Sequence, residues 1–179
     1  MVIGVDLGSR TIKIVAWQGS KMVDYAITES GFEPHEQAKS MLADYQPEHV
    51  VATGYGRHLA KEHFADKAIT EIKAHALGIH TLHPEVTTIV DIGGQDSKVI
   101  SLNAKGQVAN FQMNDKCAAG TGRFLEIMAA SLTYPLHAFG PAALASDQSI
   151  QINSMCTVFA ESEVISMKNR GVPRQHIAR

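Results

Sequence analysis

The chain has 179 residues, 45% of them hydrophobic, which is enough to bury one ordinary core or two small ones. Sixteen basic and eighteen acidic residues leave a formal charge of −2 with no run of five like charges, so neither nucleic acid nor an anionic membrane surface is indicated as a partner. No basic leader precedes the first apolar stretch, and no apolar run approaches the length that spans a bilayer. We therefore expect a cytoplasmic protein with no membrane partner.

The first half of the chain predicts a three-stranded meander followed by alternating helices and strands. The meander is expected at 2–8, 11–17 and 22–28, where β-rich runs are separated by short turns. Pro34 then opens a helix that should reach about Tyr45. The elements expected after it are a strand at 49–54, a helix at 58–64, a strand at 68–72 and a helix at 74–82.

The second half repeats the meander. The strands are expected at 87–93, 97–103 and 107–113. Helices should follow at 121–132, 140–145, 157–170 and 173–179, the third of them ended by Gly171 and Pro173. This duplication predicts two lobes, residues 1–85 and 86–179, of which the second would be incomplete.

An octet of the form Asp-x-Gly-x-x-x-x-Lys occurs at the first turn of each meander. The two copies are Asp6-Leu-Gly-Ser-Arg-Thr-Ile-Lys13 and Asp91-Ile-Gly-Gly-Gln-Asp-Ser-Lys98. Glycine lets backbone N–H groups approach phosphate oxygens, and the aspartate can hold Mg²⁺, usually through water. A single copy would be read as a plain β-hairpin. The repetition instead predicts two hairpins that clamp the β- and γ-phosphates of one nucleotide.

The arrangement resembles the superfamily of actin, sugar kinases and the seventy-kilodalton heat-shock ATPases. That resemblance implies an α/β fold built from duplicated ribonuclease-H-like lobes, each with a phosphate loop. It does not select a reaction, because the superfamily contains kinases, filaments and chaperones. A small-molecule kinase and an inactive nucleotide-binding remnant therefore remain as alternative functions.

The two cysteines allow two interpretations. Cys117 and Cys156 are thirty-nine residues apart, and each precedes a predicted helix, where the helix dipole favours a thiolate. They are either small buried residues or metal ligands. Two thiolates cannot complete a tetrahedral metal or iron–sulfur site, but two copies of the chain would supply four.

Four motifs resemble the ATPases, also called component A, that activate 2-hydroxyacyl-CoA dehydratases, a group that includes benzoyl-CoA reductase ATPase subunits. They are Cys-Ala-Ala-Gly-Thr-Gly-Arg-Phe-Leu-Glu, Ser-Met-Cys-Thr-Val-Phe-Ala-Glu-Ser-Glu, Asp-Ile-Gly-Gly-Gln-Asp-Ser-Lys and Ala-Thr-Gly-Tyr-Gly-Arg. The resemblance implies a homodimer that holds one 4Fe–4S cluster through Cys117 and Cys156 of each copy. It also implies MgATP at both octets, with Asp6 and Asp91 placing Mg²⁺ and water. The nucleotide-binding residues implied are Gly8, Ser9, Arg10, Thr11, Lys13, Gly93, Gly94, Gln95 and Asp96.

The implied activity is ATP-gated electron transfer. A reduced ferredoxin or flavodoxin would charge the cluster, and nucleotide hydrolysis would reorient the lobes. One low-potential electron would then pass to a 2-hydroxyacyl-CoA dehydratase or a similar reductase component. Members of the family continue past the point where this sequence ends, so we expect a C-terminal truncation that leaves the adenine pocket incomplete.

Overall fold

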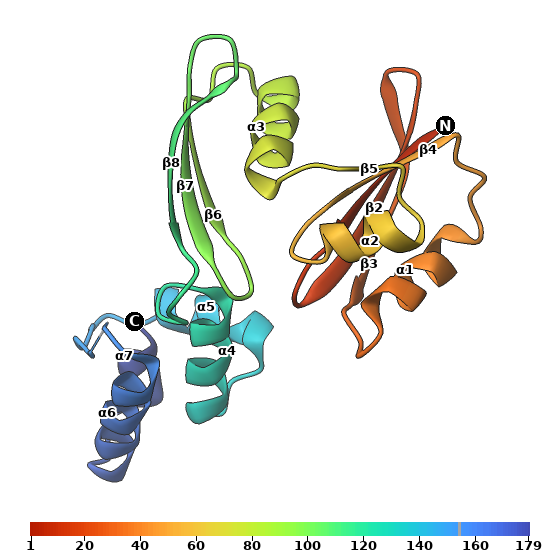
Figure 1. Ribbon diagram of the computed structural model, residues 1–179. Helices are drawn as coiled ribbons and strands as arrows, with labels where there is room; N and C mark the ends of the chain where they lie inside the picture. The colour runs from red at the N-terminus through yellow and green to blue at the C-terminus, as the bar shows by residue number, and fades with distance from the viewer. Residues whose placement is uncertain (154) are drawn as a thin grey trace. The chain divides into compact units, whose positions relative to one another are not determined.

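The computed structural model describes residues 1–153 and 155–179 (Figure 1). The strands are β1 (Val2–Leu7), β2 (Thr11–Gln18), β3 (Lys21–Glu29), β4 (His49–Thr53), β5 (Lys67–Ala68), β6 (Thr88–Ile92), β7 (Ser97–Leu102) and β8 (Val108–Asn114). The helices are α1 (Pro34–Leu42), α2 (Arg57–His63), α3 (Glu71–Leu82), α4 (Gly122–Ser131), α5 (Leu136–Leu144), α6 (Thr157–Asn169) and α7 (Arg174–Ala178). The chain forms two compact units, 1–89 with 100–111, and 90–99 with 112–179.

A five-stranded sheet, in the order β3-β2-β1-β4-β5, forms the first unit's main layer. Strands β1, β2 and β3 are antiparallel neighbours, whereas β4 and β5 run parallel to β1. Ile3, Val5 and Leu7 alternate with more exposed residues along β1, so every second side chain enters the core. Helices α1 and α2 cover this face through Ala38 and Ala60, which are fully buried.

A second core in the first unit lies between α3 and the ends of the later strands. Ala76 of α3 is buried together with Ile89, Ile100 and Leu102. Strands β6, β7 and β8 form a three-stranded sheet in that order, as the repeated meander predicts. The turn between β7 and β8 contains Gly106, whose positive φ of 70° is a conformation that glycine adopts without strain.

The helices of the second unit pack around their own core. Met128 of α4 and Leu132, the residue that caps its end, are buried against Ala160 and Val164 of α6, and Ile177 of α7 joins them. This packing forms one apolar cluster beneath the segments that precede α4 and α6. None of the helices in the described part of the chain is long and apolar enough to cross a membrane.

Two expected elements differ from the structure. The strand expected at 68–72 is wrong beyond Ala68, because Thr70 accepts a hydrogen bond from the Lys73 N–H at 3.3 Å and begins α3 there. The helix expected at 140–145 begins earlier, at Leu136, and includes Pro141. Tertiary contacts outweigh the breaking tendency of that proline. The lobe boundary expected at residues 85 and 86 stays a prediction.

Candidate functional site

The first octet forms the turn between β1 and β2, which we call turn 1 (residues 6–13). Antiparallel pairing places Asp6 opposite Lys13, and the Lys13 ammonium donates to Asp6 Oδ2 at 2.7 Å. The Gly8 N–H donates to the Thr11 carbonyl at 3.1 Å, and the Ser30 hydroxyl donates to the Gly8 carbonyl at 2.9 Å. The octet spacing therefore sets both the hairpin register and the Asp–Lys pair.

The Asp6 carboxylate has one satisfied and one unsatisfied oxygen. Its Oδ1 is buried without a hydrogen-bond partner. Gly54, with φ of 93°, lies against this oxygen so closely that a Cβ at that position would be 2.4 Å from it. A buried carboxylate oxygen normally has a partner, and a hydrated Mg²⁺ ion would supply one. Asp6 therefore fits the predicted magnesium-placing role.

The second octet forms turn 2 (residues 91–98), between β6 and β7. The Lys98 ammonium donates to Asp91 Oδ2 at 3.2 Å and to Asp96 Oδ1 at 2.7 Å. The Lys98 side chain is 3% exposed, whereas that of Lys13 is 45% exposed. The Gly93 N–H donates to the Asp96 carbonyl at 2.8 Å and closes the turn. Turn 2 thus contains a buried cation between two carboxylates, which turn 1 lacks.

The remaining predicted nucleotide-binding residues line the two turns. Those that are half-buried are Gly8, Ser9, Thr11, Gly93, Gly94 and Asp96. Arg10 of turn 1 and Gln95 of turn 2 are exposed. Each turn therefore presents one exposed polar side chain in addition to its Asp–Lys pair.

Helix α4 is hydrogen-bonded to turn 2. The Gly122 N–H donates to the Gly93 carbonyl at 2.8 Å, and the Arg123 N–H donates to the Gly94 carbonyl at 2.9 Å. The first N–H groups of a helix have no partner inside it, and here the turn supplies the acceptors. A Cβ on Gly122 would lie 3.1 Å from the Gly93 carbonyl oxygen, a tight contact that glycine avoids.

The two cysteines lie close to each other in the second unit. Cys117 Sγ is 3.7 Å from the Met155 carbonyl oxygen, one residue before Cys156. Both are free thiols and partly buried. Cys156 is the N-cap residue of α6, as predicted, but four residues separate Cys117 from α4. The sequence thus placed Cys156 at its helix correctly and placed Cys117 too near to α4.

A repeated Asn-x-x-Cys pattern, which was not among the predicted features, holds the backbone of both cysteine segments. Asn114 Oδ1 accepts from the Lys116 N–H at 3.4 Å and from the Cys117 N–H at 3.2 Å. Asn153 Oδ1 accepts from the Met155 N–H at 3.0 Å and from the Cys156 N–H at 3.3 Å. Asparagine side chains commonly stabilise such local turns. The signal was available, since each asparagine stands three residues before its cysteine.

Three further hydrogen bonds hold these cysteine segments in place. The Asn114 amide donates to the carbonyls of Cys117 and Ala119, both at 2.9 Å. The Asn153 N–H donates to Glu163 Oε2 on α6 at 2.8 Å. Glu163 is ten residues away in sequence, and only the packing of this segment against α6 reveals the contact.

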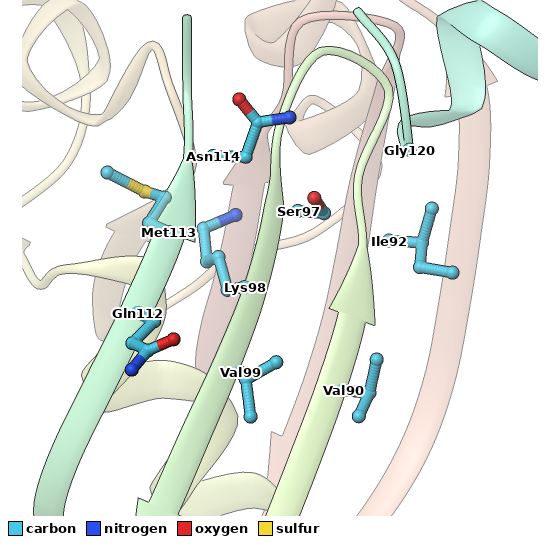
Figure 2. Close-up of a pocket in the computed structure, with 9 residues that line it drawn as sticks. All are labelled: Val90, Ile92, Ser97, Lys98, Val99, Gln112, Met113, Asn114 and Gly120. Atoms are coloured by element: carbon cyan, nitrogen blue, oxygen red, sulfur yellow. The ribbon is translucent and has the colours of Figure 1, made fainter. Parts of the chain in front are cut away.

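An open pocket of about 420 Å³ lies in the second unit (Figure 2). Its lining includes Lys98 of turn 2 and Asn114, which supports Cys117, together with the apolar side chains of Val90, Ile92 and Val99. The carboxylates of turn 2 do not line it. The pocket therefore borders turn 2 on the side of Lys98.

The described residues include one Asp–Lys turn in each unit and two free thiols in the second unit. The chain matches the model of the BadF/BadG/BcrA/BcrD ATPase family over residues 3–179. The chain belongs to this family. Its membership confirms the predicted family and the predicted ATPase activity.

Relatives and solved structures agree with this assignment. The activator of lactoyl-CoA dehydratase from Anaerotignum propionicum is 42% identical over 184 residues, covering 98% of this chain and 70% of its own length. The crystal structure of (R)-2-hydroxyglutaryl-CoA dehydratase component A from Acidaminococcus fermentans matches with a TM-score of 0.89 and 39% identity. The match covers 99% of this chain and 71% of that structure's chain. The activator of the 2-hydroxyisocaproyl-CoA dehydratase from Clostridium difficile, with bound ADPNP, matches with a TM-score of 0.88 and 40% identity. The match covers 99% of this chain and 69% of that activator.

These matches confirm the predicted α/β fold class. The chain spans 69–71% of the length of the two solved activators. The roles of the individual site residues, Mg²⁺, the iron–sulfur cluster and the homodimer remain predictions.

Replacing Asn114 with alanine should destabilise the second unit by about 1 kcal/mol, because part-buried N–H and carbonyl groups of the cysteine segment lose their partner. Asn110→Ala is the matched control, since Asn110 Oδ1 accepts only from the adjacent Phe111 N–H among the contacts described. Urea unfolding of both variants measures the difference. Equal midpoints would contradict a supporting role for Asn114.

Proposed function

We propose that this chain is an ATP-hydrolysing activator that passes a low-potential electron to a 2-hydroxyacyl-CoA dehydratase or a similar acyl-CoA reductase component. Named relatives of the chain activate dehydratases of this kind. One structural observation carries the proposal: turn 2 is hydrogen-bonded to α4, directly after the Cys117 segment. A nucleotide-sensing turn and a redox-ligand segment are thereby parts of one connected structure.

Nucleotide binding is assigned to both turns. A solved relative binds ADPNP, a nucleotide with three phosphate-type groups. In turn 1, the Gly8 N–H closes the turn, so backbone N–H groups for phosphate would come from the residues after it, and Asp6 supplies its unsatisfied oxygen. In turn 2, Lys98 pairs with both Asp91 and Asp96, which leaves one net negative charge for a cation, while Gln95 is exposed. Phosphoryl-group transfer to water depends mostly on positioning and charge neutralisation, which these groups provide.

Magnesium fits the donor set of each turn. Hard carboxylate oxygens are what Mg²⁺ prefers, and the ion would supply positive charge beside the phosphates. Asp6 and Asp91 are the residues that would hold it, through water. Asp91 also orients the attacking water in this proposal, and its ion pair with Lys98 fixes the carboxylate direction.

An iron–sulfur cluster fits the two thiols if a second copy of the chain contributes. Cys117 and Cys156 are adjacent, partly exposed and not joined to each other. A 4Fe–4S cluster requires four thiolates, so we propose a homodimer with two ligands from each copy. The cluster would store one electron, supplied by a ferredoxin or flavodoxin. The chain's own part is to hold both thiolates, with Cys156 at the positive N-terminus of α6.

In this proposal, ATP hydrolysis changes the positions of the two thiols through movement of turn 2. Loss of the γ-phosphate would change the environment of Gln95 and Asp96 and so the position of the Gly93 and Gly94 carbonyls. Since α4 donates to both carbonyls, its first turn moves with them. Conformational switches commonly depend on such a contact with a γ-phosphate.

The protein purified or reconstituted without oxygen should contain about two irons per chain, as expected for four irons shared by two copies. Cys117→Ser and Cys156→Ser should each lose that iron, whereas Ser162→Ala, an exposed change on α6, should retain it. Iron and acid-labile sulfide analysis measures the content. Iron that persists in both serine variants would refute ligation by these cysteines.

Asp91→Asn should lower ATP turnover by about 100-fold or more, the usual size for losing a well-placed electrostatic group. Asp115→Asn, which alters an exposed aspartate paired with Lys116, is the control and should turn over ATP normally. Phosphate release without any added acceptor metabolite is the measurement, with thermal unfolding to verify that both variants are folded. Turnover that requires an acceptor metabolite would indicate a kinase instead.

A further inference from the structure

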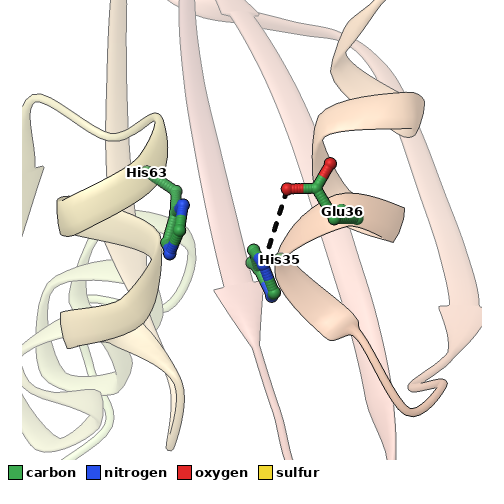
Figure 3. Close-up of side chains that lie close together, drawn as sticks. All are labelled: His35, Glu36 and His63. Atoms are coloured by element: carbon green, nitrogen blue, oxygen red, sulfur yellow. Dashed lines mark ion pairs between the residues drawn. The ribbon is translucent and has the colours of Figure 1, made fainter.

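We propose that His35, Glu36 and His63 in the first unit form a binding site for a divalent transition-metal ion, with Zn²⁺ as the ion to test. Figure 3 shows the three side chains, two from the start of α1 and one from the end of α2. One ligand atom from each residue lies within 4.8 Å of the other two. None of the three residues belongs to turn 1, turn 2 or the cysteine segments, so the proposal does not depend on the proposed function.

The distances are close to those of a metal site. His35 Nε2 is 3.5 Å from Glu36 Oε1, and the His35 and His63 ring centroids are 4.4 Å apart. Zinc bonds to nitrogen and oxygen of about 2.0–2.2 Å in tetrahedral geometry place ligand atoms roughly 3.4 Å apart. Ligand atoms that lie up to 4.8 Å apart would have to approach each other by at most about 1.4 Å to bind one zinc ion, a distance within the range of side-chain rotation.

An unsatisfied polar atom is a second, independent indication. The Nδ1 atom of His35 is buried and has no hydrogen-bond partner, while the side chain as a whole is 21% exposed. Buried imidazole nitrogens normally have a partner. A metal ion bound at this nitrogen would be the missing partner and would fix the tautomer of the ring.

The charges at the site favour a carboxylate ligand but also weaken cation binding. The hydrogen bond from Lys39 at 2.7 Å holds the pKa of the Glu36 carboxyl below its usual value, so Glu36 is ionised at neutral pH. The same ammonium repels a metal ion, and its hydrogen bond occupies Glu36 Oε1, one of the two oxygens that could bind the ion. Removing the Lys39 charge should therefore tighten metal binding.

The ligand set selects the class of metal. Two imidazoles and one carboxylate suit Zn²⁺, Ni²⁺ or Cu²⁺, whereas Mg²⁺ prefers oxygen ligands in octahedral geometry. A bound ion would join α1 to α2, which cover the same face of the five-stranded sheet through Ala38 and Ala60. The expected consequence is a first unit that is more resistant to unfolding when the ion is present.

Zinc titration by calorimetry tests the site, using the full chain with Cys117→Ser and Cys156→Ser so that thiols do not compete. We expect saturable binding of one Zn²⁺ per chain, no competition by millimolar Mg²⁺, and a higher unfolding temperature. His63→Ala should weaken binding at least tenfold, and Lys39→Gln should tighten it. His58→Ala is the matched control, because His58 is an exposed histidine on the same helix outside the cluster, and it should bind normally.

A second measurement keeps the test decisive if a variant does not fold. In the unaltered chain, zinc should shift the imidazole NMR signals of His35 and His63 and leave that of His58 in place. Equal zinc affinity of the His63→Ala and His58→Ala variants would overturn the proposal. Unchanged His35 and His63 signals at saturating zinc would overturn it as well.

Discussion

Two backbone hydrogen bonds, from Gly122 and Arg123 to the carbonyls of Gly93 and Gly94, are the constraint on which the candidate site depends. They satisfy N–H groups that a helix leaves open at its start, so breaking them would expose unpaired polar groups on both sides. Glycine at position 122 permits the approach, since a Cβ would be 3.1 Å from the turn. Turn 2, α4 and the segment that contains Cys117 should therefore move together within the second unit.

The two copies of the octet are not equivalent, although their sequences share a spacing. In turn 1 the Asp6–Lys13 pair is open to solvent, and Asp6 keeps a buried oxygen without a partner. In turn 2 Lys98 is buried between two carboxylates, so its charge is compensated and its position is fixed. A buried ion network is costly to break when one partner moves. Turn 2 is therefore the better suited of the two to transmit a change at the phosphates to the rest of its unit.

The sequence predicted what depends on local spacing and missed what depends on packing. Alternation predicted the strands, and the octet predicted a turn between them; the pairing of Asp6 with Lys13 follows from that turn length but was not predicted. The contact of Asn153 with Glu163 arises only when a loop folds back on α6. His35 and His63 are likewise distant in sequence and meet because α1 and α2 pack on one sheet face. The start of α3 was missed because the capping hydrogen bond of Thr70 outweighed the β-branched run before it.

The central claim is that turn 2 and the Cys117 segment respond together to nucleotide. Amide hydrogen exchange of residues 114–131, with and without a non-hydrolysable ATP analogue and Mg²⁺, tests it most directly. The account predicts slower exchange at Gly122, Arg123 and Cys117 when nucleotide is bound, because the hydrogen bonds that hold these N–H groups become more rigid. Unchanged exchange at all three positions, in protein shown by calorimetry to be saturated with nucleotide, would contradict it.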